Sequence, residues 1–217
     1  MKTAIIFDLD GTILDTLEDL YLSVNQTVRY FGFPERTKDE VQSFVGNGMP
    51  KLIERSLPKN VSRKVFDAAL EYFKKYYNGH STDHTCPYEN IPAALCELKD
   101  RGYVLGVLTN KAHTATIPLC EKYFSGVFDI VLGQTESFPT KPHSAGMEYI
   151  KSQLGADKMI YVGDSEVDIQ TAKNAGVPCV SVSWGFKTRE FLLDHKADMV
   201  AENVSEMLEF IYETSQN

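Results

Sequence analysis

The sequence predicts an α/β fold in which helices cover a parallel sheet and a domain of four helices is inserted near its start. Three observations indicate this fold. Short apolar runs alternate with helical patterns along most of the chain, whereas one long segment near the N-terminus shows helical periodicity only. The chain has 217 residues, which is long for one domain and short for two.

The predicted strands are short apolar runs, mostly bounded by Gly, Asp or Asn. They are Ala4–Phe7, Tyr103–Leu108, Val127–Leu132, Met159–Val162, Pro178–Val182 and Met199–Ala201. The helices predicted between and after them are Ile91–Arg101, Ile117–Phe124, Ser144–Leu154, Glu166–Ala175 and Val204–Tyr212. Pro118 is expected in the first turn of its helix, because deeper in a helix it clashes with the preceding turn. Alternating buried strands and helices favour a Rossmann-like parallel sheet.

The inserted domain is predicted over residues 15–84. Apolar side chains recur at helical spacing near its start, from Leu17 to Phe31, and near its end, from Phe66 to Tyr77. Two shorter helices, Thr37–Val45 and Met49–Ser56, are expected between them. Residues 1–14 and 85–217 then form the α/β core, whose length of about 147 residues fits one domain.

Composition excludes several classes of protein. The 22 Lys and Arg residues against 30 Asp and Glu residues give a net charge of −8, which opposes nucleic-acid binding. Apolar runs of four or five residues fall far short of the roughly 18 that span a membrane. The four cysteines show no paired spacing and no secretory signal precedes them, so we expect reduced thiols in a cytoplasmic protein.

Two carboxylates follow the first predicted strand in the run Phe7-Asp8-Leu9-Asp10-Gly11-Thr12. At this spacing both would point to one face if strand geometry continued. Like charges so close are unfavourable unless a cation or a proton is shared between them, and Mg²⁺ prefers oxygen ligands. Gly11 would let the backbone approach a ligand. A polar turn after a strand is the alternative interpretation.

A second acidic cluster, with Asp164 and Asp168, follows the predicted strand Met159–Val162. Because the carboxyl ends of parallel strands meet at one edge, Asp164 is expected near the first carboxylate pair. Ser165 and Asp168 also match a capping box at a helix start, and this can coexist with a role in a site.

Thr109 and Asn110 end another strand, and Lys141 follows the next. These residues offer a hydroxyl, backbone donors and a cation at the same edge. Taken alone, each is better explained as a helix cap, a turn or a surface charge.

In this order the motifs resemble those of the haloacid dehalogenase superfamily of phosphohydrolases, and the match runs over residues 8–168. The helical insertion resembles the cap of members with a helical cap. Within the superfamily the chain is most similar to phosphoglycolate phosphatase-like enzymes, through Phe44-Val45-Gly46-Asn47-Gly48 and Ser183-Trp184-Gly185-Phe186.

The resemblance implies a role for each motif residue. Asp8 would be the nucleophile that forms an aspartyl phosphate, and Asp10 the general acid and base. Mg²⁺ would be held by Asp8, the backbone carbonyl of Asp10 and Asp164. Lys141 would offset the crowded carboxylates and hold the phosphate.

The remaining motif residues would support the phosphate and the metal. Gly11, Thr109 and Asn110 would bind phosphate oxygens, and Asp168 would orient a water on the metal. The loop Gly46-Asn47-Gly48 would present donors to the substrate, or would be a plain turn between helices.

The expected reaction is hydrolysis of a small phosphorylated metabolite that resembles phosphoglycolate. The protein is expected to be a monomer or a homodimer. A β-phosphoglucomutase-like phosphosugar mutase and an inorganic pyrophosphatase remain alternatives on the same intermediate. A signalling receiver domain also clusters Asp, Thr and Lys on a parallel sheet. Its acceptor Asp follows the third strand, however, so the motif order here disfavours it.

Overall fold

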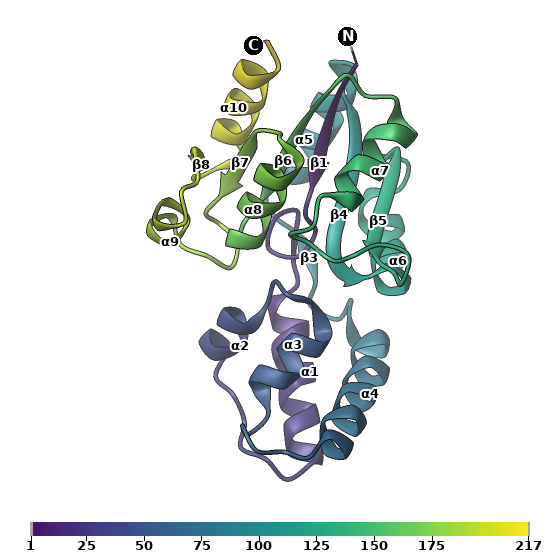
Figure 1. Cartoon of the computed structure of the whole chain (residues 1–217), viewed down its shortest axis with the longest axis vertical. Coiled ribbons are helices and arrows are strands. Elements are labelled where there is room, and N and C mark those ends of the chain that lie inside the picture. The colour runs from purple at the N-terminus through teal and green to yellow at the C-terminus, as the bar shows by residue number, and fades with distance from the viewer. Residues whose placement is uncertain (1, 217) are drawn as a thin grey trace. The chain divides into compact units, whose positions relative to one another are not determined.

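The computed structural model describes residues 2–216, and the chain divides into two compact units. The core unit comprises residues 1–14 and 87–217, and the helical unit comprises residues 15–86. The chain leaves the core unit through β2 (Leu14–Asp15) and returns through β3 (Cys86–Pro87), and these two strands pair with each other. Figure 1 shows both units, with their elements labelled except for β2.

The core unit contains a parallel sheet with the strand order β5-β4-β1-β6-β7-β8. The strands are β1 (Thr3–Phe7), β4 (Val104–Ala112), β5 (Ile130–Gln134), β6 (Lys158–Gly163), β7 (Cys179–Val182) and β8 (Met199–Ala201). From β1 the chain builds outward to β5 on one side and then returns to β6 on the other. The order therefore reverses at β1, and a crevice at the carboxyl ends of strands beside such a reversal is the usual ligand site of an open α/β sheet.

Helices cover both faces of the sheet, as Figure 1 shows. The helices are α5 (Ile91–Asp100), α6 (His113–Phe124), α7 (Ala145–Leu154), α8 (Glu166–Ala175), α9 (Arg189–Asp194) and α10 (Val204–Gln216). Side chains alternate along β1: Ile5 and Phe7 pack with α5, α6 and α10, whereas Ala4 and Ile6 pack with α7 and α8. Strands buried on both faces explain the continuous apolar runs of the sequence.

The helical unit consists of α1 (Leu17–Tyr30), α2 (Lys38–Phe44), α3 (Gly48–Ser56) and α4 (Arg63–His80). Its core joins Leu20, Val24 and Val28 of α1 with Phe73 and Tyr77 of α4. Thr37 and Ser62 accept hydrogen bonds from the first turns of α2 and α4, which fixes where these helices begin.

The predicted fold class is confirmed. The differences lie in element boundaries and in the short elements β2, β3 and α9, which were not predicted. Helix α6 begins at His113, so Pro118 lies inside the helix and its prediction as a first-turn residue is wrong. Burial of Leu119 and Cys120 against the core compensates for the hydrogen bond that proline cannot donate. Strand β4 continues to Ala112 with a register shift after Leu108, beyond its apolar run.

All four cysteines carry free thiols, as expected from their spacing. Over residues 2–216, none of the helices combines the length and apolar character needed to cross a membrane.

Candidate active site

Polar side chains from four segments meet at the carboxyl edge of the sheet. Asp8 and Asp10 follow β1, Lys111 lies near the end of β4, Lys141 lies beyond β5, and Asp164 follows β6. Four of these side chains are buried, and the fifth, Asp10, is 15% exposed at its side chain. The core motifs predicted from sequence are therefore brought together by the strand topology of the core unit.

Asp8 lies against the ammonium group of Lys141. Lys141 Nζ is 3.0 Å from Asp8 Oδ1, and the backbone N–H of Leu9 donates to the same oxygen at 2.7 Å. Burial raises the pKa of Asp8 to about 6; Lys141 opposes this rise, while Asp168 and Asp10 add to it. Within residues 2–216 both donors reach Oδ1, so Oδ2 is the oxygen available for attack on a ligand.

Lys141 is held in place by more than Asp8. Its ammonium group also donates to Asp168 Oδ1 at 2.7 Å and to the hydroxyl of Tyr161 at 3.0 Å. Burial alone would lower the pKa of Lys141, but the carboxylates of Asp168 and Asp8 outweigh it and raise the pKa above its ordinary value. Lys141 is therefore a permanent cation beside Asp8.

Asp164 lies on the other side of the same cluster. Its Oδ1 accepts from the Thr12 hydroxyl at 3.1 Å and its Oδ2 from the backbone N–H of Phe186 at 2.7 Å. Burial and the nearby carboxylates of Asp168 and Asp8 raise the pKa of Asp164 well above its ordinary value. Two hydrogen bonds do not compensate for this crowding of negative charge.

Asp168 forms the predicted capping box with Ser165 at the start of α8. Its Oδ2 accepts from the backbone N–H and the hydroxyl of Ser165, while its Oδ1 accepts from Lys141 and Tyr161. Both oxygens are thus engaged. The arrangement makes Asp168 the anchor of Lys141.

The side chain of Asn110 joins two motifs. Its Oδ1 accepts from the backbone N–H of Lys141 at 2.8 Å, and its Nδ2 donates to the carbonyl of Lys141 at 3.2 Å. Thr109 is also buried, and its hydroxyl accepts from the backbone N–H of Lys111 at 3.3 Å. The side chain of Asn110 therefore orients Lys141.

The cluster fits a divalent cation. One carboxylate oxygen from each of Asp8, Asp164 and Asp168 lies within 4.8 Å of the others. Each oxygen of Asp168 already accepts two hydrogen bonds, one of them from the Lys141 ammonium group, whereas each oxygen of Asp164 accepts one from a neutral donor. Asp8 and Asp164 are therefore the carboxylates better suited to direct ligation. The backbone approaches them closely: a Cβ on Gly11 would lie 2.5 Å from Asp164 Oδ2, and one on Gly185 would lie 2.2 Å from the carbonyl of Gly11. Glycine at these positions preserves the space around Asp164.

Three contributors were not assigned roles from the sequence. Lys111 contacts Asp10, Tyr161 contacts Lys141, and the backbone of Phe186 contacts Asp164. Lys111 directly follows Thr109-Asn110 and continues that polar run, which was the available signal. Tyr161 lies inside an apolar strand, and no local pattern marks it.

In the helical unit, Gly46-Asn47-Gly48 connects α2 and α3. Both glycines have positive φ, 114° and 81°, and Gly48 begins α3. Asn47 Oδ1 accepts from Arg55 Nη2 at 2.7 Å, and Arg55 Nη1 donates to the carbonyl of Phe44. Arg55 therefore fixes this loop from within the helical unit.

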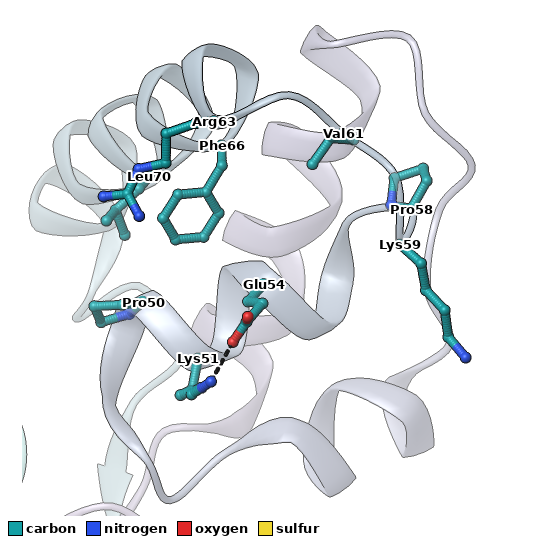
Figure 2. A pocket seen from close by; sticks show the side chains of 9 residues that line it. All are labelled: Pro50, Lys51, Glu54, Pro58, Lys59, Val61, Arg63, Phe66 and Leu70. Carbon is teal, nitrogen blue, oxygen red and sulfur yellow. Dashed lines mark hydrogen bonds and ion pairs between the residues drawn. The ribbon is translucent and has the colours of Figure 1, made fainter.

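The helical unit also contains a groove of about 880 Å³ between α3 and α4 (Figure 2). The ring of Phe66 and the side chain of Leu70 form one wall, and Pro50 lies across from them. Lys51 and Glu54 in its lining pair with each other. None of the predicted motif residues lines this groove, so its volume does not identify it as the reaction site.

Comparison with known proteins identifies the family. The model of the haloacid dehalogenase-like hydrolases matches residues 5–182 of the chain. The chain belongs to this family. The match includes every core motif residue described above, which confirms the family predicted from the motifs.

Curated relatives cover nearly the whole chain. The chain is 33% identical over 220 residues to a phosphoglycolate phosphatase of Vibrio cholerae, covering 95% of this chain and 96% of the relative. A phosphoglycolate phosphatase of Aquifex aeolicus is 30% identical, with 95% and 99% covered. These similarities identify the chain as a phosphatase, a hydrolase of phosphoric monoesters.

Solved structures with a similar fold are also described as phosphatases. A structure from Lactobacillus delbrueckii subsp. bulgaricus, assigned by prediction as a phosphoglycolate phosphatase, is 32% identical with a TM-score of 0.92. It matches over 96% of this chain and 97% of that one. A structure from Clostridium acetobutylicum, described as a predicted phosphatase, is 25% identical with a TM-score of 0.87. It matches over 98% of this chain and 99% of that one.

Proposed function

We propose that this protein is an Mg²⁺-dependent phosphatase that hydrolyses phosphoglycolate or a closely similar small phosphate monoester through an aspartyl phosphate on Asp8. The observation that carries the proposal is the buried contact between Asp8 Oδ1 and Lys141, 3.0 Å apart, beside the crowded carboxylate of Asp164. This arrangement orients a carboxylate as a nucleophile and leaves an uncompensated negative cluster beside it.

The first step is attack of Asp8 Oδ2 on phosphorus. A bond forms between this oxygen and phosphorus as the bond from phosphorus to the ester oxygen breaks. Lys141 orients Asp8 and places positive charge beside the transferring phosphoryl group. The Thr109 hydroxyl and backbone N–H groups near Gly11 and Asn110 are the proposed ligands of the phosphate oxygens. The N–H of Gly11 itself donates to the Leu14 carbonyl at 2.9 Å, so neighbouring N–H groups are the proposed donors at that turn.

Asp10 would handle the protons. It donates one to the leaving alkoxide in the first step and takes one from water in the second, when the aspartyl phosphate is hydrolysed to release inorganic phosphate. Its position two residues after the nucleophile places it at the same sheet edge.

Asp8, Asp164 and the backbone carbonyl of Asp10 would hold the Mg²⁺. When bound, the cation supplies positive charge that offsets the carboxylates and the phosphate. Asp168, with both oxygens engaged by protein donors, holds Lys141 and would also orient a water on the cation.

The substrate proposal rests on the curated relatives. They are phosphoglycolate phosphatases, and the chain is similar to them over almost their full length. The helical unit would exclude water and select the substrate, and the Gly46-Asn47-Gly48 loop is the proposed source of selecting donors. A cytoplasmic location is proposed from the four free thiols, two of which are exposed.

The decisive experiment measures phosphate release from 2-phosphoglycolate, glucose 1-phosphate and inorganic pyrophosphate with Mg²⁺, for the wild type and Asp8→Asn. With glucose 1-phosphate, formation of an isomeric sugar phosphate is measured as well. We expect turnover of phosphoglycolate by the wild type and a loss of at least about 1,000-fold in Asp8→Asn, because an amide is a far weaker nucleophile. Asp67→Asn, which changes an exposed aspartate of α4, is the matched control and should retain wild-type rates.

Each other outcome has a defined meaning. Wild-type turnover by Asp8→Asn would contradict the nucleophile. Conversion of glucose 1-phosphate to an isomeric phosphate would identify a mutase, and preferential cleavage of pyrophosphate would identify a pyrophosphatase. Full activity after exhaustive chelation would contradict the metal requirement.

A further inference from the structure

A second buried lysine lies at the site and has no role in the proposal above. The side chain of Lys111 is 2% exposed, and its Nζ lies 3.0 Å from Asp10 Oδ1 and 3.2 Å from Asp10 Oδ2. Contact with both oxygens fixes the rotation of the carboxyl group as well as its position.

Lys111 is itself held by the sheet. It lies in the part of β4 that extends past the apolar run, and its backbone N–H donates to the Thr109 hydroxyl at 3.3 Å. Asp10 follows β1 in a turn, where the Gly11 N–H donates to the Leu14 carbonyl and three further backbone N–H groups donate to the Leu9 carbonyl. The backbone around Asp10 is thus fixed by its own turn, and a lysine side chain on a strand fixes the orientation of the Asp10 carboxyl group.

The stability of the fold is a poor explanation for this pair. Removing a lysine ammonium group from water is costly, so replacing a buried ion pair by apolar residues is often neutral or stabilising. A buried pair beside the reacting carboxylates is therefore better explained by a role in the reaction.

We infer that Lys111 is a positioning residue that holds the Asp10 carboxyl group where it can deliver a proton to the leaving oxygen of the ester. The inference rests on the proposed function, since it assigns Lys111 to the acid step of that reaction. Lys111 does not itself exchange a proton.

The leaving group separates this role from a structural one. The leaving group of phosphoglycolate is the alkoxide of the glycolate hydroxyl, a strong base that must be protonated as it departs, whereas p-nitrophenolate departs as an anion. The ratio kcat/KM reports on steps up to release of the alcohol, so the later hydrolysis of the aspartyl phosphate, common to both esters, does not enter it. Loss of proton delivery should therefore affect kcat/KM for the alkyl ester selectively.

The experiment compares kcat/KM for 2-phosphoglycolate and p-nitrophenyl phosphate in Lys111→Met and the wild type, both with saturating Mg²⁺. We expect a fall of at least about 30-fold for the alkyl ester and less than about 3-fold for the aryl ester, since general acid catalysis contributes about 100-fold or more. The control variant Lys99→Met removes an ion pair of the same unit, between Lys99 and Asp129, whose side chains are 34% and 35% exposed. It should leave both values within about 2-fold.

A double-mutant cycle tests whether Lys111 acts through Asp10. In an Asp10→Asn background, adding Lys111→Met should change kcat/KM for phosphoglycolate by less than about 2-fold, because the group that Lys111 positions is already absent. The double variant also leaves no unpaired buried charge, so it remains informative if Lys111→Met alone does not fold.

Equal falls for both esters, or no fall for either, would overturn the positioning role while leaving the proposed function intact. So would a further large loss from Lys111→Met in the Asp10→Asn background. A wild-type protein that turns over neither ester would overturn the proposed function, and the role of Lys111 with it.

Discussion

Two buried aspartates, one in each unit, show that burial alone does not set the pKa of a carboxyl group. Asp164 in the core unit is 1% exposed and Asp19 in the helical unit is 2% exposed. Burial disfavours the ionised form of both, yet the pKa of Asp164 is raised well above its ordinary value and that of Asp19 is lowered. The difference comes from the neighbours.

Asp19 is surrounded by donors. The backbone N–H groups of His84 and Thr85 and the Thr85 hydroxyl donate to its carboxylate, and His84 Nδ1 lies 2.9 Å from Oδ1. Asp164 has two donors and lies among other carboxylates. The helical unit uses a buried charge to join α1 to the returning chain, whereas the core unit leaves its charge unbalanced for a ligand.

Among the substitutions that test this comparison, Asp164→Asn should give the largest effect. The amide can accept from the Phe186 N–H and donate to the Thr12 hydroxyl, so the fold keeps its hydrogen bonds while the repulsion from Asp8 and Asp168 falls. We expect a loss of turnover of at least about 100-fold, corresponding to several kcal/mol of transition-state stabilisation. The Tm without metal should be unchanged or higher, and Mg²⁺ should no longer raise it.

Steady-state assays and thermal unfolding with and without Mg²⁺ check both expectations. If the Tm of Asp164→Asn without metal is lower than that of the wild type, Asp164 stabilises the fold instead of holding a cation.

Asp19→Asn should reverse this pattern. The NH₂ group of asparagine would face hydrogen-bond donors whose bonds the carboxylate accepts in the wild type, so some of these bonds are lost. We expect the free energy of unfolding of the helical unit to fall by about 2 kcal/mol. Because the folded-state pKa of Asp19 is lowered, its stabilisation is complete above the ordinary pKa of 3.8 and is lost as pH falls through the folded-state value.

Urea unfolding at several pH values tests this prediction. The difference between wild type and Asp19→Asn should be constant at neutral pH and shrink below about pH 3.8. A difference that grows on acidification would contradict the assignment of the charged form.

Glu54→Gln should give the smallest effect. Glu54 pairs with Lys51 on α3, but both side chains are more than half exposed. Water and salt screen such a pair, so we expect no measurable change in Tm. A clear destabilisation on replacing Glu54 would mean that the groove between α3 and α4 depends on this pair for its shape.

The sequence located the core cluster because the rules that connect pattern to position are strong there. Asp8, Asp10, Lys141 and Asp164 follow strands or the loops beyond them, and parallel strands bring these ends to one edge. The contact of Lys111 with Asp10 was not predicted, since β4 continues past its apolar run and no periodicity marks the extension.

Short elements escaped prediction for a different reason. The strands β2 and β3 are two residues each and α9 is six residues, too short for a hydrophobic period to be visible. The start of α6 at His113 depends on packing against the core, and Pro118 gave a misleading local signal.

The pairing of β2 with β3 has a consequence for how this protein can change. Within the core unit, the N–H of Tyr88 donates to the carbonyl of Ile13, so the two ends of the interruption are hydrogen-bonded neighbours. A segment that departs and rejoins at adjacent points can be exchanged for a longer one, a shorter one or a tight turn without moving the sheet. The residues of the reaction site and the helical insertion can therefore change independently in evolution, because the insertion is connected through the paired strands β2 and β3.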